Sequence, residues 1–165
     1  MFYNHPRVTA RPLKHEEIMG QDLYIRKSIT IDAPIDIVWD ILTNPDHTQK
    51  YMYGTRVDSD WNVGSHVHWV GESEGEKVVY VKGEVVKIEQ EKHLAFTVIS
   101  AGNQYDDTPN NYTTVTYDLT SEGDKTILNL TQGDFADADH GEERYMETNS
   151  SWDQSLAKLK EVAES

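Results

Sequence analysis

Residues 140–164 predict one long amphipathic helix at the end of the chain. One face of this segment repeats apolar or aromatic side chains every three to four residues, while Glu, Lys, Asp and Ser fill the other face. The predicted inward face consists of Tyr145, Asn149, Trp152, Leu156, Leu159 and Ala163. At about 1.5 Å per residue, a helix of this length can lie across a whole β-sheet. The rest of the chain is therefore expected to supply a sheet that this helix covers.

Most of the remaining chain has the alternating pattern of half-buried β-strands. Strands are predicted over residues 22–31, 55–60, 66–72, 78–90, 94–100, 112–120 and 125–132. Gly83 lies inside the longest of them and is expected to mark a bulge or bend. After the first strand the pattern changes to two short helices, the first beginning near Pro34 with Asp32 as its cap and the second beginning at Asn44. The polar residues 101–111 predict a mobile loop.

This order of elements predicts an α+β fold. A curved antiparallel sheet of about seven strands is expected to wrap around the long C-terminal helix, because a sheet needs a layer over its apolar face and long strands bend where they carry bulges. The 165 residues show one composition throughout, which predicts a single domain over residues 22–165 preceded by an extended arm over residues 1–21.

Charge and composition exclude several classes of function. The formal net charge is −14 and the chain has no Lys/Arg cluster, so neither nucleic acid nor an anionic membrane is an expected partner. The absence of cysteine excludes disulfides and thiolate chemistry. The start of the chain lacks the apolar core of a signal peptide, and no stretch approaches the roughly 20 apolar residues of a membrane span. A cytoplasmic monomer or homodimer is the expectation.

Five stretches carry a resemblance to a known family. They are residues 31–39, residues 61–65, residues 83–88 followed by 94–97, residues 126–135, and the helix positions Trp152, Leu156, Leu159 and Lys160. In order and spacing they resemble the activator of heat-shock protein 90 ATPase homologue family, which belongs to the helix-grip superfamily of START, pollen-allergen and polyketide-cyclase domains. Two positions depart from the pattern: Gln132 stands where such domains often have His, and residues 103–111 are unusually polar. The family's co-chaperone members also carry a separate ATPase-stimulating domain, whereas only residues 1–21 precede the domain here.

The resemblance implies a cavity between the sheet and the C-terminal helix that holds a small hydrophobic molecule such as a lipid, a flavonoid or a polyketide-like compound. Aromatic and apolar residues are the expected lining, with amides as polar contacts. The predicted ligand-binding residues are Trp39, Tyr51, Trp69, Phe96, Tyr117, Gln132, Asn149, Trp152 and Leu156. The alternative for each of them is a purely structural role, in which the aromatic side chains fill the core and the amides bond to the backbone.

Two other functions stay open: a chaperone-associated interaction module, and a cyclase-like enzyme. No catalytic residue is assigned, because no nucleophile elbow, phosphate loop or zinc-protease motif occurs. His66 and His68 lie on one face of a strand and could bind zinc with His47 or an acidic residue, but an ordinary strand face is the simpler interpretation. The acidic residues before the last helix (Asp134, Asp137 and Asp139, next to His140) are interpreted as charge at the helix N-terminus rather than as a calcium site. No metal or cofactor is expected.

Overall fold

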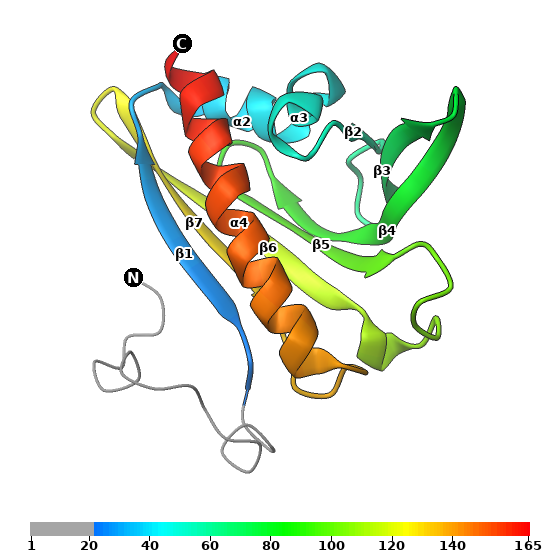
Figure 1. Cartoon of the computed structure of the whole chain (residues 1–165). Coiled ribbons are helices and arrows are strands. Elements are labelled where there is room, and N and C mark those ends of the chain that lie inside the picture. Colours follow the sequence, from blue (N-terminus) through cyan, green and yellow to red (C-terminus); the bar gives the residue numbers. More distant parts are fainter. Residues whose placement is uncertain (1–21) are drawn as a thin grey trace.

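The computed structural model describes residues 22–165 and contains one seven-stranded antiparallel sheet (Figure 1). The arm predicted over residues 1–21 lies outside the described residues. The strands are β1 (Ile25–Ile31), β2 (Arg56–Asp58), β3 (His66–Ser73), β4 (Glu76–Glu89), β5 (His93–Ser100), β6 (Thr113–Glu122) and β7 (Lys125–Gly133). The helices are α2 (Ile35–Thr43), α3 (Pro45–Tyr51) and α4 (Gly141–Glu164), and a short 3-10 helix, η2, spans Pro109–Asn111. Neighbouring strands follow the order β1-β7-β6-β5-β4-β3-β2.

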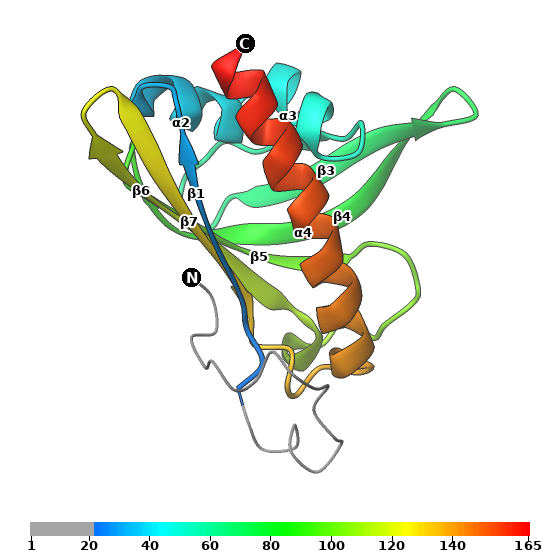
Figure 2. The same ribbon diagram turned by 60° about the vertical axis from the view of Figure 1, so that its left-hand side comes forward.

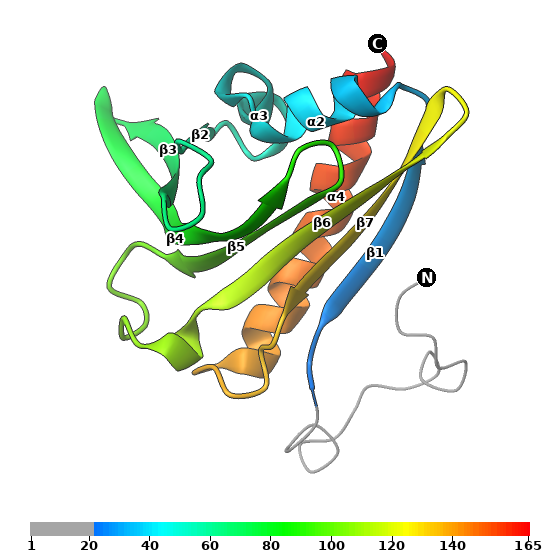
Figure 3. The ribbon, with the colours of Figure 1, turned by 180° about the vertical axis from the view of Figure 1, so that it is seen from behind.

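The long helix α4 lies across the concave face of this sheet, as predicted (Figures 1 and 2). Trp152, Leu156 and Leu159 are buried, and they join the alternating inward residues of β6 and β7 in one core. These inward residues are Val115, Tyr117, Leu119, Leu128, Leu130 and Gln132. All six are buried, as the alternation of the strands predicted over residues 112–120 and 125–132 requires. Seen from behind, the convex face carries no helix over residues 22–165 (Figure 3). The α+β prediction is therefore confirmed.

Curvature comes from two irregularities in the strand register. One lies between Trp69 and Val70 in the pairing of β3 with β4, and the other lies between Val85 and Lys87 in the pairing of β4 with β5. Gly83 does not itself form a bulge, because it pairs regularly with Val67. It lies instead where the backbones of the neighbouring strands β4 and β5 approach each other very closely: a Cβ atom added at Gly83 would be 1.6 Å from the carbonyl oxygen of Thr97.

The cap of α2 differs from the prediction. Pro34 occupies the N-cap position without a side-chain hydrogen bond, so Asp32 does not cap this helix. The chain turns before the helix begins, and the backbone N–H of Asp32 donates to the Glu164 carboxylate at the end of α4 over 2.8 Å. Asn44 does begin the next helix, since its side chain accepts a hydrogen bond of 2.9 Å from the backbone N–H of Asp46.

The loop predicted to be mobile is hydrogen-bonded to the start of α4. Asn111 is fully buried, and its side-chain oxygen accepts from the backbone N–H of Asp139 over 2.8 Å. Its backbone carbonyl accepts from the Arg144 guanidinium, also over 2.8 Å. Asn111 therefore bonds both to the residues just before α4 and to α4 itself. These bonds hold the loop in place, because the loss of either would leave a buried polar group unsatisfied.

Asp134, one of the acidic residues before α4, bonds to backbone groups rather than to the helix end. One carboxylate oxygen of Asp134 accepts from the backbone N–H of Leu23 at 2.8 Å and from that of Ala136 at 2.9 Å. Asp134 therefore joins the start of β1 to the turn after β7. The acidic residues of the first turn of α4 are Glu142 and Glu143 instead.

Candidate functional site

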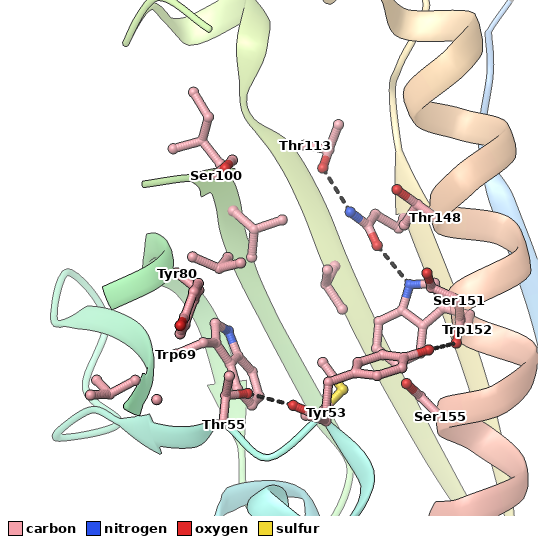
Figure 4. A pocket seen from close by; sticks show the side chains of 18 of the residues that line it. Tyr53, Thr55, Trp69, Tyr80, Ser100, Thr113, Thr148, Ser151, Trp152 and Ser155 are labelled. Atoms are coloured by element: carbon pink, nitrogen blue, oxygen red, sulfur yellow. Dashed lines mark hydrogen bonds between the residues drawn. The ribbon is translucent and has the colours of Figure 1, made fainter. Parts of the chain in front are cut away.

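A cavity of about 1100 Å³ lies between the concave face of the sheet and α4. Its sheet side comes from β3, β4, β5, β6 and the end of β7, its helix side from α4, and the connection between α3 and β2 closes one flank. The apolar part of the lining consists of Met52, Trp69, Val70, Val81, Phe96, Val98, Ile99, Val115, Phe135 and Trp152. Figure 4 shows Trp69 on the sheet side and Trp152 on the helix side. Pockets of small-molecule binding proteins are typically about 300–1,000 Å³ and mainly apolar, so this space is large enough for such a ligand.

Gln132 joins the sheet to the helix at the inner wall of the cavity. Its amide NH2 donates to the Thr113 hydroxyl over 3.0 Å, and its amide oxygen accepts from the Trp152 indole N–H over 2.7 Å (Figure 4). All three side chains are buried, so these bonds satisfy groups that would otherwise be costly to remove from water. The result is a fixed orientation of the Trp152 ring, which packs edge-to-face on Tyr117 with the ring centroids 6.2 Å apart.

The rim of the cavity is polar and carries both signs of charge. Exposed charged residues in the lining are Arg56, Glu72, Lys77 and Glu147. Half-buried Arg144 stacks over the Tyr105 ring at 4.3 Å, and burial lowers the pKa of its guanidinium, which still leaves it charged at neutral pH. Together the apolar wall and the charged rim suit an amphipathic molecule.

Tyr53 bridges the flank of the cavity to the helix. Its hydroxyl donates to the backbone carbonyl of Ser151 on α4 over 2.7 Å (Figure 4). The side chain is 61% exposed, and the backbone of Tyr53 and Gly54 is left-handed, with φ of 55° and 80°. Because few contacts other than this hydrogen bond hold an exposed side chain, we expect the Tyr53 bridge to open readily.

Replacing Tyr53 with phenylalanine is expected to loosen this flank without unfolding the protein. The hydrogen bond contributes about 0.5–1.5 kcal/mol, so the amide of Thr55, which bonds to Met52, should exchange with solvent up to about 10-fold faster. Native-state hydrogen exchange measures this effect. Tyr80→Phe is the matched control, because Tyr80 also lines the cavity but has no hydroxyl partner among residues 22–165. Equal exchange rates in both variants would contradict a restraining role for the bridge.

The structure brings four of the nine predicted ligand-binding residues into the cavity lining: Trp69, Phe96, Gln132 and Trp152. Trp39, Tyr51, Tyr117 and Leu156 lie in the core outside the lining, and half-buried Asn149 lies beside it on α4. The helix contributes a neighbouring stripe instead, composed of Arg144, Thr148, Ser151 and Ser155 with Trp152. Thr148, Ser151 and Ser155 have small hydroxyl side chains and recur at helical spacing. This spacing is the signal by which the sequence could have indicated the face of the helix that borders the cavity.

Two buried tyrosines beside the cavity are held in the neutral form. Burial raises the pKa of both the Tyr51 and the Tyr117 hydroxyl, and for Tyr51 the proximity of Tyr117 adds to the increase. Neither hydroxyl has a hydrogen-bond partner among the described residues. A phenol with a raised pKa is a poor proton donor and carries no charge at neutral pH, so these groups contribute shape and apolar surface to the core.

A curved antiparallel sheet gripping one long C-terminal helix, with a cavity between them, defines the helix-grip class of proteins. The family model described as Activator of Hsp90 ATPase homolog 1-like protein matches residues 32–164. The chain belongs to this family.

Solved structures show the same fold. The solution structure of ChR145 from Cytophaga hutchinsonii is 30% identical over 87% of this chain and 95% of that one, with a TM-score of 0.70. The Aha1 dimer from Colwellia psychrerythraea is 20% identical over 86% and 96%, with a TM-score of 0.65. PFC0360w, an HSP90 activator from Plasmodium falciparum, is 17% identical over 68% and 73%, with a TM-score of 0.55. No curated protein matches the sequence, and no helix within residues 22–165 has the length and apolarity to cross a membrane.

Proposed function

We propose that the protein binds a small, largely apolar molecule in the cavity under α4. The observation that carries this proposal is the cavity itself, about 1100 Å³ of space with an aromatic lining between sheet and helix. The cavity is partly open, so its apolar walls are exposed to solvent and offer dispersion contacts that no side chain uses. A ligand that filled it would gain those contacts and the burial of its own surface.

The lining indicates the kind of ligand. Trp69, Phe96 and Trp152 offer ring faces and edges for a flat aromatic or polyketide-like body, or for an acyl chain. The hydroxyls of Thr148 and Ser151 and the charged rim suit a polar end directed outward. Gln132 already has a partner for its oxygen and for its NH2 group, so we expect it to position Trp152 first and to contact the ligand second.

Native mass spectrometry of the purified protein tests the proposal first, followed by thermal-shift screening with lipids, flavonoids and polyketide-like aromatics. A compound present at 100 times its dissociation constant should stabilise the fold by about 2.7 kcal/mol. A co-purified mass or a clear shift would support ligand binding and identify the chemical class. A bare protein that none of these compounds stabilises would count against it.

Filling the cavity from the helix side is expected to block binding. Thr148→Trp places a large ring in the cavity, and we expect it to weaken the best compound of the screen by at least about 10-fold, equivalent to about 1.4 kcal/mol. Stability should stay within about 1 kcal/mol, because Thr148 is only half-buried. Met146→Trp is the matched control on the same helix, since Met146 is 63% exposed and lies outside the lining. Unchanged affinity in the Thr148 variant would exclude the cavity as the binding site.

A chaperone-associated interaction module is the second candidate, favoured by family membership and by the net charge of −14. An acidic surface that docks on a basic partner should release it when salt screens the charges. When the protein is immobilised on a resin, it should therefore bind a purified heat-shock protein 90 homologue at low salt and release it at high salt. No retention at either salt concentration would argue against this function.

A cyclase-like enzyme has less support. Proton transfer needs a titratable group whose pKa is tuned to the working pH, placed against the substrate. The polar groups at the inner wall belong to Gln132, Thr113 and Trp152, which do not titrate in the physiological range. The pKa values of the neighbouring Tyr51 and Tyr117 are raised, away from neutrality.

A further inference from the structure

Asp58, His66 and His68 meet on the face of the sheet that is opposite to the cavity. His66 and His68 are two residues apart in β3 and therefore point to the same side. Asp58 of β2 is the direct register partner of His68. The intervening Val67 and the following Trp69 are buried on the cavity side, so the three polar side chains lie on the convex face, which no described helix covers (Figure 3).

The geometry of this cluster resembles that of a metal site before the ion binds. The Nε2 atom of His66 is 3.1 Å from a carboxylate oxygen of Asp58, and the two imidazole centroids are 4.3 Å apart. One potential ligand atom from each residue lies within 4.8 Å of the other two. Around tetrahedral zinc, with bonds of about 2.0–2.1 Å, neighbouring ligand atoms are about 3.4 Å apart. The His66–Asp58 pair, at 3.1 Å, is already close to this spacing. Rotation of the exposed Asp58 side chain and of the half-buried His68 ring would supply the remaining contraction.

We propose that these three residues bind a zinc-class divalent cation. Two imidazole nitrogens and one carboxylate oxygen are the donors that Zn²⁺ prefers, and this set leaves one coordination position for water or a partner group. Two stacked imidazoles repel each other when both are protonated, whereas a shared cation uses the lone pairs of both neutral rings. No other group of three such residues occurs within residues 22–165.

The neighbouring charges favour a cation at this place. Glu84 is the register partner of His66 and adds a second carboxylate to the same face. Lys82 is the register partner of His68, but its ammonium group bonds to Asp107 over 2.8 Å. Arg56, two residues before Asp58 on β2, is likewise paired with Asp46 over 2.8 Å. Both neighbouring positive charges are therefore paired with carboxylates outside the cluster, which leaves its own carboxylates to attract a cation.

A bound ion would join β2 to β3 through side chains. The strand β2 has only three residues and forms the edge of the sheet. Its first residue, Arg56, and the preceding Thr55 belong to the cavity rim. Metal binding on the convex face would therefore make β2 more rigid. It would thereby stiffen the part of the cavity rim that β2 forms on the concave face. This site does not depend on the proposed ligand, because its residues lie outside the cavity lining.

Isothermal titration of the full chain with ZnCl₂ tests the proposal. We expect one site, and we expect His66→Ala, His68→Ala and Asp58→Asn each to weaken it by more than about 10-fold, because changes in residues that only orient a metal ligand already cost about 10–100-fold. Co²⁺ titration should produce visible absorption bands that disappear in the same variants. Far-UV circular dichroism checks that each variant is folded, and the near-isosteric Asp58→Asn perturbs the exposed edge least.

His93→Ala is the matched control. His93 forms a comparable pair with Asp118, with 2.6 Å between Nδ1 and the carboxylate oxygen, but belongs to no group of three. This variant and a His5→Ala/His15→Ala double variant should bind Zn²⁺ as tightly as the unaltered protein. Three results would overturn the proposal: no binding at about 1 mM Zn²⁺, unchanged binding in the three cluster variants, or an equal loss of binding in the controls. A dissociation constant of about 1 mM is already very weak, so a lack of binding at that concentration excludes a site.

Discussion

Replacing Trp152 with alanine is expected to lower the free energy of unfolding by about 3–5 kcal/mol, the usual cost of removing a large aromatic side chain from a core. Trp152 is 5% exposed, packs on Tyr117, and donates its indole N–H to Gln132. Its removal would enlarge a cavity that already exists and leave the Gln132 oxygen without a partner. Urea denaturation of the two proteins measures the difference.

The variant Trp152→Phe separates packing from hydrogen bonding. It keeps a ring against Tyr117 but lacks the N–H donor, so a loss closer to about 1–3 kcal/mol is expected for the unsatisfied amide oxygen. An alanine variant that loses less than about 1 kcal/mol would show that Trp152 contributes little to the core. Because Trp152 belongs to both core and cavity, a change in ligand uptake by its alanine variant cannot be separated from instability. Thr148→Trp is therefore the sharper test of binding.

The second large effect is expected at Gly83. An alanine Cβ there would lie 1.6 Å from the carbonyl oxygen of Thr97, and the obstacle is backbone rather than a flexible side chain. Either β4 or β5 must move, so we expect Gly83→Ala to cost about 3 kcal/mol or more, at or above the upper end of ordinary overpacking. Chemical denaturation followed by tryptophan fluorescence measures this loss.

Gly102→Ala is the control for Gly83→Ala. A Cβ at Gly102 would meet no atom within 4 Å. The same chemical change should therefore be neutral or stabilise the protein by up to about 1 kcal/mol through the unfolded chain. An equal change in the free energy of unfolding for the two substitutions would contradict the close approach of the β4 and β5 backbones at Gly83.

The proposed ligand site and the proposed metal site lie on opposite faces of the sheet. A ligand under α4 would be recognised mainly by apolar shape, whereas the cluster of Asp58, His66 and His68 would recognise a cation by its donor atoms. The cavity experiments and the zinc titration therefore succeed or fail separately. The heat-shock protein 90 experiment concerns a third property, the overall negative charge of the chain.

Local periodicity was enough to predict most of the fold. In the strand predicted over residues 112–120, successive residues point to opposite faces, and the structure buries Val115, Tyr117 and Leu119 on one of them. The 3.6-residue repeat likewise predicts α4 to within one residue of its start. Such patterns are properties of neighbouring residues, so the sequence by itself determined the elements, their order and their inward faces.

The cavity lining, by contrast, was decided by the tertiary structure. Periodicity predicts Asn149 on the inward side of α4, but the crossing of helix and sheet turns Thr148 and Ser151 to the cavity instead. In the same way, only strand pairing places Asp58 beside His68 and brings Gly83 against Thr97. These contacts depend on how much the sheet bends and on the register between strands, which arise from the packing of distant segments and leave no local pattern in the sequence.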